Sequence, residues 1–465
     1  MMQQDFKQAL AEVSEWMNAY QQNVADYPVV AALNGGEILQ QIPDFAPKEA
    51  EHFSEIFADF KKIIVPGISH WQHPQFLGYF PSNTSPPSVL AEMLVASLGV
   101  QCMSWLTSPA ATELEIRMME WLRDLWGLPE AFSGVIQDSA SSSTLIALLV
   151  ARERATQFAI NQAGAAGHKL SAYCSSEAHT SIEKAIKIAG IGLQNLRKIP
   201  VDEQQSIRID LLQQAIAEDI EQGFTPFFMV GALGTTGSTA VDDLAAMAKI
   251  AKAQQIWFHI DAAYAGSALM LPEVRQLAAG YTEADSMVVN PHKWLLCNFD
   301  CSAFFIRDKE SLLKTFTLGL IPEYLKSPNS TGQTNFMNWG VGLGRRFRAL
   351  KLWFVLRWYG TNGLRDLITH HLDLSARLEQ WVRQEPHFEV LAQRHFNLLC
   401  FRLKASDEIN MELLRRINAS GKVFMTHTKI NQQLALRMVI GQTEVNEQHV
   451  REAWQLIKNL AKDLM

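Results

Sequence analysis

Residues 256–294 read IWFHIDAAYAGSALMLPEVRQLAAGYTEADSMVVNPHKW, and this stretch decides the fold. Two short apolar runs, 256–260 and 286–289, predict strands, and each is followed directly by polar residues. The same pattern extends on both sides, with strands predicted at 172–175, 227–233 and 303–306 and helices at 182–189, 211–220 and 242–253. Short apolar runs that alternate with helical segments are typical of an α/β fold with a mostly parallel sheet.

The segment before this core predicts helices and loops. Apolar residues at three- and four-residue steps indicate amphipathic helices near 6–20 and 53–64. Residues 71–108, rich in aromatic residues, Pro and Ser, are predicted as an ordered loop region, and a helix then begins after Ser108 and ends at Gly127. The two leading helices have little to bury against locally, so they need either the core of the same chain or a partner subunit.

The segment after the core predicts a long polar loop and a small second domain. Residues 317–338 are rich in Gly, Pro, Ser and Asn, and loops of this length are usually functional or mobile. A helix is predicted at 349–359. The remaining elements form a small α/β unit, with strands at 398–403, 423–425 and 434–439 and helices at 411–418 and 450–465.

The composition excludes several classes of protein. Of the 465 residues, 48% are hydrophobic and 19% are charged, which rules out a disordered chain. The 41 Lys and Arg against 48 Asp and Glu give a net charge of −7, which argues against nucleic-acid binding. Five cysteines without a Cys-x-x-Cys pair indicate a reducing compartment. Since the chain also lacks a signal-like start and an apolar run of ~18 residues, we expect a cytoplasmic protein without a membrane span.

Lys293 is the strongest candidate for chemistry. It lies in the sequence Asn290-Pro291-His292-Lys293-Trp294, between the apolar run that ends at Val289 and Leu295-Leu296. Burial lowers the pKa of an amine and makes it nucleophilic, which is the requirement for a Schiff-base lysine. The alternative is a lysine on an exposed turn, which is where most lysines lie.

Asp261 follows the predicted strand 256–260 directly. Ligands of open α/β sheets bind at the carboxyl ends of strands, and an aspartate there can keep a heteroaromatic nitrogen protonated. The neighbouring Ala262 and Ala263 would let a flat ring approach the backbone. The alternative is an aspartate that caps the next helix.

A run of hydroxyl residues, 139–144 (SASSST), precedes a helical segment. Such a helix N-terminus can bind phosphate, although serine-rich caps are common and Asp138 speaks against a nearby anion. The sequence 231–237 (GALGTTG) lacks the spacing of a dinucleotide or P-loop motif but places threonine at a strand end. Together, a Schiff-base lysine, a ring-nitrogen aspartate and a phosphate site describe a pyridoxal phosphate pocket.

The chain resembles the group II pyridoxal-phosphate decarboxylases, and among them the aromatic L-amino-acid decarboxylases, almost from end to end. The matching segments are HPQFLGYFP (73–81), SPAATELE (108–115), FFMVGALGTT (227–236), HIDAAYAGSA (259–268), NPHKWLLCNFDCSA (290–303), LGRRFRALKLWFV (343–355) and AWQLIKNLA (453–461). Such a set of long, ordered matches is highly specific.

This resemblance implies a particular α/β architecture, fold type I of the pyridoxal phosphate enzymes, which is like aspartate aminotransferase. Residues 1–84 should form a helical segment swapped onto the partner subunit, 85–352 a large cofactor-binding domain, and 353–465 a small domain. The resemblance therefore implies an obligate homodimer.

The resemblance also implies roles for individual residues, and it implies no metal site. The implied catalytic residues are Lys293, His179, Tyr324 and Asp261. The implied cofactor-binding residues are Ser139, Ala140, Ser141, Thr236, Asp261, Ala263, Asn290, His292 and Lys293. The implied substrate-side residues are Trp71, Tyr79, Phe80, Pro81, Ser82 and His179.

The implied activity is decarboxylation of an aromatic L-amino acid, such as Dopa, tryptophan, tyrosine or phenylalanine, to its amine. Two alternatives stay open: oxidative conversion to an aromatic aldehyde, and a non-aromatic substrate. In aldehyde-forming relatives a phenylalanine stands at the position of Tyr324, or an asparagine at that of His179, so the residues present here favour the amine. A cofactor-free scaffold of the same fold is the non-enzyme hypothesis.

Overall fold

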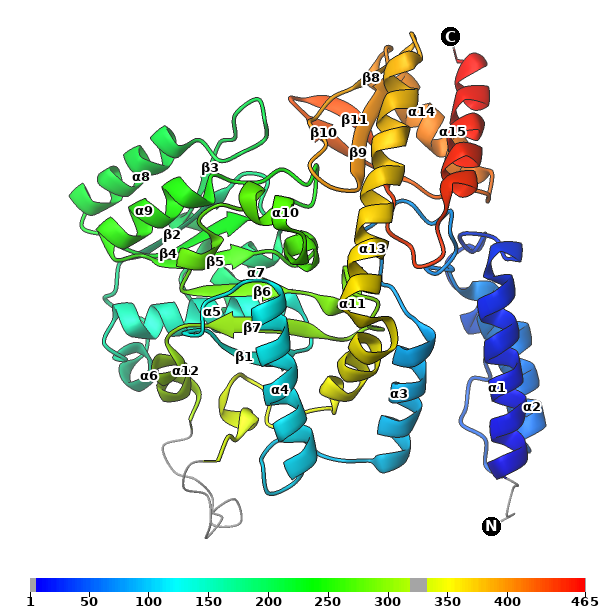
Figure 1. Ribbon diagram of the computed structural model, residues 1–465, viewed down its shortest axis with the longest axis horizontal. Helices are drawn as coiled ribbons and strands as arrows, with labels where there is room; N and C mark the ends of the chain where they lie inside the picture. The colour runs from blue at the N-terminus through cyan, green and yellow to red at the C-terminus, as the bar shows by residue number, and fades with distance from the viewer. Residues whose placement is uncertain (1–5, 318–332, 465) are drawn as a thin grey trace.

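The computed structural model describes residues 6–317 and 333–464 (Figure 1). A seven-stranded sheet forms its centre, in the order β1-β7-β6-β5-β4-β2-β3. The strands are β1 (Ser133–Gln137), β2 (Leu170–Ser175), β3 (Leu196–Ile199), β4 (Thr225–Ala232), β5 (Trp257–Asp261), β6 (Ser286–Val289) and β7 (Ser302–Ile306). Strands β2 to β6 pair in parallel, and β7 is antiparallel to both β6 and β1. The predicted α/β class with a mostly parallel sheet is confirmed.

Helices cover both faces of this sheet, which explains why its strands are apolar on both sides. Phe228, Trp257 and Phe304 point to one face and pack with α5 (Ala140–Ala155) and α7 (Ser181–Ile188). Met229 and Phe258, one position further along β4 and β5, point to the other face. That face packs with α4 (Pro109–Leu125), α8 (Ile209–Glu221), α9 (Leu244–Gln254) and α13 (Arg348–Gln384).

A second, antiparallel sheet lies in the C-terminal part of the chain, in the order β10-β11-β9-β8. Its strands are β8 (Phe388–Val390), β9 (Leu398–Leu403), β10 (Thr426–Ile430) and β11 (Gln433–Val439). Helices α14 (Asp407–Ala419) and α15 (Glu447–Lys462) pack on it. The long helix α13 connects the two sheets and is kinked at Gly360, whose φ is 65°. The expected domain boundary at 352/353 falls inside α13, and the three-part division stays a prediction.

The N-terminal helices α1 (Phe6–Asn23) and α2 (Phe53–Asp59) lie side by side at the edge of the molecule (Figure 1). Trp16 contacts Phe57 and Phe60 edge to face, which holds the pair together. Neither helix contains a buried residue. The other α-helices within the described residues are α3 (Pro86–Leu98), α6 (Ile160–Ala163), α10 (Pro272–Leu277), α11 (Pro291–Trp294) and α12 (Lys309–Phe316).

Two local expectations were wrong. The region 71–108 was predicted as loop, but it contains α3, which begins after Ser85 with Pro86 and Pro87 in its first turn. Residues 423–425 do not belong to the second sheet, because Phe424 pairs with Phe76 in an isolated bridge. The helix predicted at 349–359 is confirmed as the first part of α13, whose backbone leaves helical geometry at Gly360 before a second helical segment runs to Gln384. Strands β1, β3 and β8 were not anticipated, since each is short and only partly apolar.

No helix within the described residues is both long and apolar enough to cross a membrane.

Candidate active site

A cavity of about 190 Å³ opens at the carboxyl ends of β4, β5 and β6. Eleven of the residues singled out from the sequence line it: Phe80, Ser139, Ala140, Ser141, His179, Thr236, Asp261, Ala263, Asn290, His292 and Lys293. Phe80 comes from the loop before α3, and the others come from the carboxyl ends of strands or the segments that follow them, including the N-terminus of α5. Strand ends that lie far apart in the chain meet there because parallel strands share one edge of the sheet.

Lys293 lies in the short helix α11, which follows β6 and begins with Pro291. Its backbone carbonyl accepts a hydrogen bond from Asn83 Nδ2 at 2.9 Å, which fixes the helix. Burial lowers the pKa of the Lys293 amine, and the negative charge of Asp261 opposes that shift. Because a lowered pKa increases the fraction of free amine, Lys293 is suited to act as a nucleophile.

Asp261 is the last residue of β5 and faces the same cavity. Its Oδ1 accepts a hydrogen bond from the Ala263 backbone N–H at 3.1 Å, which orients the carboxylate. None of the described residues donates a hydrogen bond to the second carboxylate oxygen, which can accept one from a protonated nitrogen of a ligand. A charge-assisted bond of this kind is stronger than one between neutral groups.

The N-terminus of α5 forms a wall of the cavity that is suited to bind an anion. Ser139 is the N-cap residue, and its hydroxyl accepts from the Ser142 backbone N–H at 3.3 Å. Ala140 and Ser141 are the first two residues of the helix, where backbone N–H groups have no partner within the helix. Such a helix end binds phosphate. The exposed Asp138 does not line the cavity, although its Oδ1 also lies 3.3 Å from the Ser139 hydroxyl.

His292 and Asn290 add hydrogen-bonding groups beside this wall. His292 Nδ1 accepts from the Cys301 backbone N–H at 2.9 Å, so the ring proton lies on Nε2. Burial and the neighbouring Lys293 lower the pKa of His292 to about 3, which keeps the ring neutral. Asn290 Oδ1 is buried and has no hydrogen-bond partner within the described structure. An unpaired buried amide of this kind indicates that a ligand completes the site.

His179 lines the cavity from the turn before α7 and is exposed on its outer side. Its Nδ1 accepts from the Ser181 backbone N–H at 3.2 Å. The ring therefore carries its N–H at Nε2. The hydrogen bond from Ser181 orients the His179 ring within its own turn, because the two residues are only two positions apart in the chain.

The substrate-side residues divide into two groups. Phe80 lines the cavity, as His179 does, and its ring stacks on Tyr264 at 3.9 Å between centroids. Trp71 and Tyr79 stack on each other at 5.6 Å and are 37% and 47% exposed, so in this chain they form part of the surface. Pro81 and Ser82 do not line the cavity, and Tyr324 lies outside the described residues.

Four further residues line the cavity that the sequence analysis did not assign to it: Ala232, Gly234, Thr235 and Tyr264. The first three belong to the GALGTTG segment. This segment has no nucleotide-binding spacing, and only its Thr236 was predicted to belong to the site. Tyr264 follows Asp-Ala-Ala directly, and its position at the strand end was the available signal.

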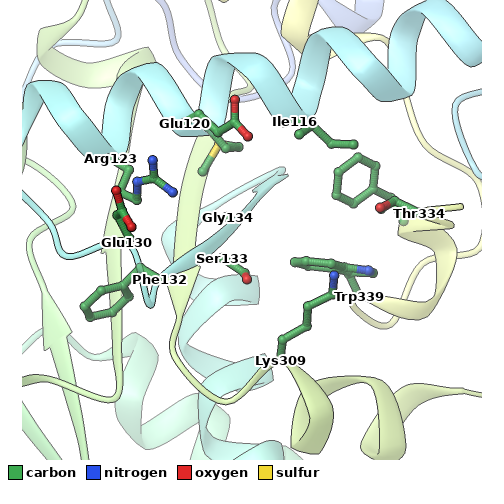
Figure 2. Close-up of a pocket in the computed structure, with 12 residues that line it drawn as sticks. Ile116, Glu120, Arg123, Glu130, Phe132, Ser133, Gly134, Lys309, Thr334 and Trp339 are labelled. Atoms are coloured by element: carbon green, nitrogen blue, oxygen red, sulfur yellow. The ribbon is translucent and has the colours of Figure 1, made fainter. Parts of the chain in front are cut away.

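A separate cavity of about 170 Å³ lies between α4 and the edge strand β1 (Figure 2). Figure 2 shows Lys309 facing Trp339, and the Lys309 Nζ lies 5.1 Å from the indole centroid. Glu120, Arg123 and Glu130 add charges of both signs. Among the described residues, none that was predicted from the sequence to belong to the site lines this cavity.

Comparison with known proteins agrees with this geometry. The family described as the pyridoxal-dependent decarboxylase conserved domain matches residues 36–404. The chain belongs to this family. The decarboxylase thus has pyridoxal 5'-phosphate as its cofactor and is a carboxy-lyase of the group that acts on aromatic amino acids.

Individual relatives cover nearly the whole decarboxylase. It is 43% identical to a phenylacetaldehyde synthase of Arabidopsis thaliana, over 96% of this chain and 94% of that protein. It is also 43% identical to an aromatic-L-amino-acid decarboxylase of Sus scrofa, over 99% of this chain and 97% of the relative. The crystal structure of an Oryza sativa tryptophan decarboxylase ("TDC with PLP and tryptamine") superimposes with a TM-score of 0.96 at 33% identity, covering 99% and 98% of the two chains. The expected fold type and family are confirmed.

The residues present fit this cofactor. The backbone N–H groups of the α5 N-terminus and the Nε2–H of His292 can donate to a phosphate, and Asp261 suits a protonated ring nitrogen. When bound, pyridoxal phosphate supplies a ring that accepts the electron pair left behind as carbon dioxide departs.

Proposed function

We propose that this decarboxylase converts an aromatic L-amino acid into the corresponding amine and carbon dioxide. The observation that carries the proposal is the convergence of the Lys293 amine and the Asp261 carboxylate in one cavity walled by Phe80. An acidic substrate would need a cation for its side chain. Lys293 is the only Lys or Arg among the described residues that line the cavity. An aromatic side chain needs only apolar surface.

We assign the following roles to the residues of the site. Lys293 supplies the nucleophilic amine, and Asp261 keeps a proton on the ring nitrogen. Ala263 and His179 lie against the cofactor ring. The phosphate is bound by Ser139, Ala140, Ser141, Asn290 and His292, with Thr236 close to the ring. By resemblance, Tyr324 delivers the proton that must reach the substrate Cα, and Trp71, Tyr79, Pro81 and Ser82 belong to the substrate side.

One relative favours a second candidate function. The phenylacetaldehyde synthase is as similar to this chain as the animal decarboxylase is. An aldehyde-forming enzyme would consume oxygen and water and release carbon dioxide, ammonia and hydrogen peroxide together with the aldehyde. His179 and Tyr324 in this sequence support the amine instead.

The proposal is tested by incubating the holoenzyme separately with Dopa, tryptophan, tyrosine, phenylalanine, 5-hydroxytryptophan and glutamate. We expect equal amounts of amine and carbon dioxide from at least one aromatic substrate and none from glutamate. Ammonia and peroxide in amounts matching carbon dioxide would establish the aldehyde synthase instead. Turnover of glutamate alone would overturn the aromatic assignment.

Replacing Tyr324 with phenylalanine is expected to shift the main product from amine to aldehyde, because the proton donor for Cα is removed and oxygen can react instead. Chromatography of both products and a peroxide assay measure the change. Tyr359→Phe, on helix α13 and not among the residues that line the Lys293 cavity, is the control and should yield only amine. If Tyr324→Phe forms only amine at the normal rate, the role assigned to Tyr324 is wrong.

We also propose that the decarboxylase is an obligate homodimer to which the N-terminal helices contribute. Helices α1 and α2 have no buried residue, and Phe6, Phe45 and Ile56 in and around them are exposed. Leu90, Leu94 and Leu98 of α3 are four residues apart and are 47–59% exposed. Exposed apolar stripes of this extent mark protein interfaces.

A charge in the α3 stripe should separate the subunits. We expect Leu94→Glu to sediment as a monomer and to lose most of its activity, because a buried unpaired carboxylate costs several kcal/mol at an interface. Leu193→Glu is the matched control, since Leu193 is similarly exposed (42%, against 47% for Leu94) but follows α7. A fully active Leu94→Glu monomer would contradict the proposal.

A cytoplasmic location is part of the proposal. The five cysteines are all buried and unpaired, as in a protein that stays in a reducing compartment.

A further inference from the structure

His259 is a fully buried histidine inside the sheet, two residues before Asp261 on β5. Because side chains alternate along a strand, His259 and Asp261 point to the same face, the one covered by α5. The imidazole stacks on Phe228 of the neighbouring strand β4, with ring centroids 5.9 Å apart. None of the roles assigned above uses this residue.

Both ring nitrogens of His259 have polar partners on other elements. Nε2 lies 3.3 Å from the Thr144 hydroxyl in the first part of α5. Nδ1 lies 2.9 Å from the Ser286 hydroxyl on β6, which also accepts from the Trp257 indole N–H at 2.8 Å. Burial lowers the pKa of His259 to about 4, although the charge of Asp261 opposes the shift. The ring is therefore neutral, and a neutral imidazole has one donor and one acceptor to satisfy both hydroxyls.

The first turn of α5 has a second polar contact with the sheet. The Ser143 hydroxyl donates to the Ser139 carbonyl at 3.1 Å and lies 3.3 Å from the Ser302 hydroxyl on β7. Ser143, Thr144 and Ser302 are all buried. This turn also carries Ala140 and Ser141, so the wall that binds phosphate is tied to two strands by directional contacts as well as by apolar packing.

We propose that His259 is a positioning residue: through Thr144 it holds the first turn of α5 at a fixed distance from Asp261. The inference rests on the proposed site, in which α5 binds the phosphate and Asp261 binds the ring nitrogen. The phosphate and the ring nitrogen belong to one cofactor molecule, so the distance between them is limited. Their protein partners lie on different elements, α5 and β5. Apolar packing is non-directional, so it fixes the distance between a helix and a strand less closely than a hydrogen bond does. The hydrogen bond between Thr144 on α5 and His259 on β5 therefore keeps the phosphate-binding turn and Asp261 at a fixed distance.

The test removes one hydroxyl with little change of shape. Apo-protein is titrated with pyridoxal phosphate, and both the dissociation constant and the visible absorption of the bound cofactor are measured. We expect Thr144→Val to bind the cofactor about five- to tenfold more weakly, the effect of one lost hydrogen bond. Thr144→Ser, which keeps the hydroxyl, should restore binding to within about twofold of the wild type. If Thr144→Val does not fold, Ser286→Ala tests the contact on the other ring nitrogen.

Tyr173→Phe is the matched control. Tyr173 is also fully buried in the sheet, and its hydroxyl donates to Asp219 at 2.6 Å, away from the cavity. We expect Tyr173→Phe to lower the melting temperature without changing cofactor affinity. Unchanged affinity in Thr144→Val, or an equal loss in Tyr173→Phe, would overturn the positioning role. If the wild type itself binds no cofactor that borohydride can reduce onto the protein, the proposed function fails instead.

Discussion

Replacing Lys293 with alanine is expected to abolish decarboxylation, with kcat at least about four orders of magnitude below the wild type. Lys293 is the only lysine among the described residues that line the cavity; burial lowers the pKa of its amine, and the Asp261 charge stands in the same cavity. Alanine removes the amine and leaves the backbone of α11 in place, held by the bond from Asn83 to the Lys293 carbonyl. The loss should therefore be chemical and not a consequence of unfolding.

A labelling measurement and a control variant test the assignment of Lys293. Borohydride reduction followed by peptide mass spectrometry should find the pyridoxyl group on the Lys293 peptide of the wild type and on no peptide of Lys293→Ala. Lys309→Ala is the control, because Lys309 lies in the second cavity, over Trp339, and should keep normal activity. Substantial turnover by Lys293→Ala, or a label on another lysine, would refute the assignment.

The second large effect is expected from Asp261→Asn, which should lower kcat about a thousandfold, equivalent to about 4 kcal/mol of transition-state stabilisation. Asparagine has the same shape as aspartate and keeps the contact with the Ala263 backbone. It has no negative charge, so it cannot keep the ring nitrogen of the cofactor protonated. The ring then accepts the electron pair from the departing carboxylate less well. Cofactor affinity should fall much less than kcat, because the phosphate contacts remain.

Asp285→Asn is the control for this substitution. Asp285 accepts from the Phe258 backbone N–H at 2.8 Å, at the opposite end of β5, and lies outside the Lys293 cavity. We expect Asp285→Asn to lower the free energy of unfolding and to leave kcat within about twofold of the wild type. A substitution outside the cavity changes the stability of the fold and not the chemistry at Lys293. If the two asparagine variants lose kcat equally, Asp261 has only a structural role.

Sequence patterns predicted the parts of the fold that depend on neighbouring residues. The apolar runs before Asp261 and Asn290 correspond to β5 and β6, because a strand buried on both faces needs a continuous apolar run. The segment that contains α3 was misread, since its Pro and Ser content resembles a loop although Pro is tolerated in a first turn.

The candidate site could be predicted only in part. Lys293, Asp261 and Ser139 each have an ordinary structural alternative, and only their combination and the family resemblance brought them together. Their meeting in one cavity, from strand ends more than a hundred residues apart, is a property of the parallel sheet. The roles proposed for His259 and Thr144 could not be predicted from the sequence, because a contact between a helix and a strand has no local sequence pattern.

By itself, the sequence determined the α/β alternation, the family and the residues able to carry the chemistry, because side-chain type and spacing are local properties of the chain. Only the tertiary structure decided that Phe80 reaches the cavity while Trp71 and Tyr79 lie on the surface. It also decided that His292 and His259 are buried and neutral. The direction of a side chain and its removal from water depend on segments that pack from elsewhere in the chain, so no stretch of sequence contains them.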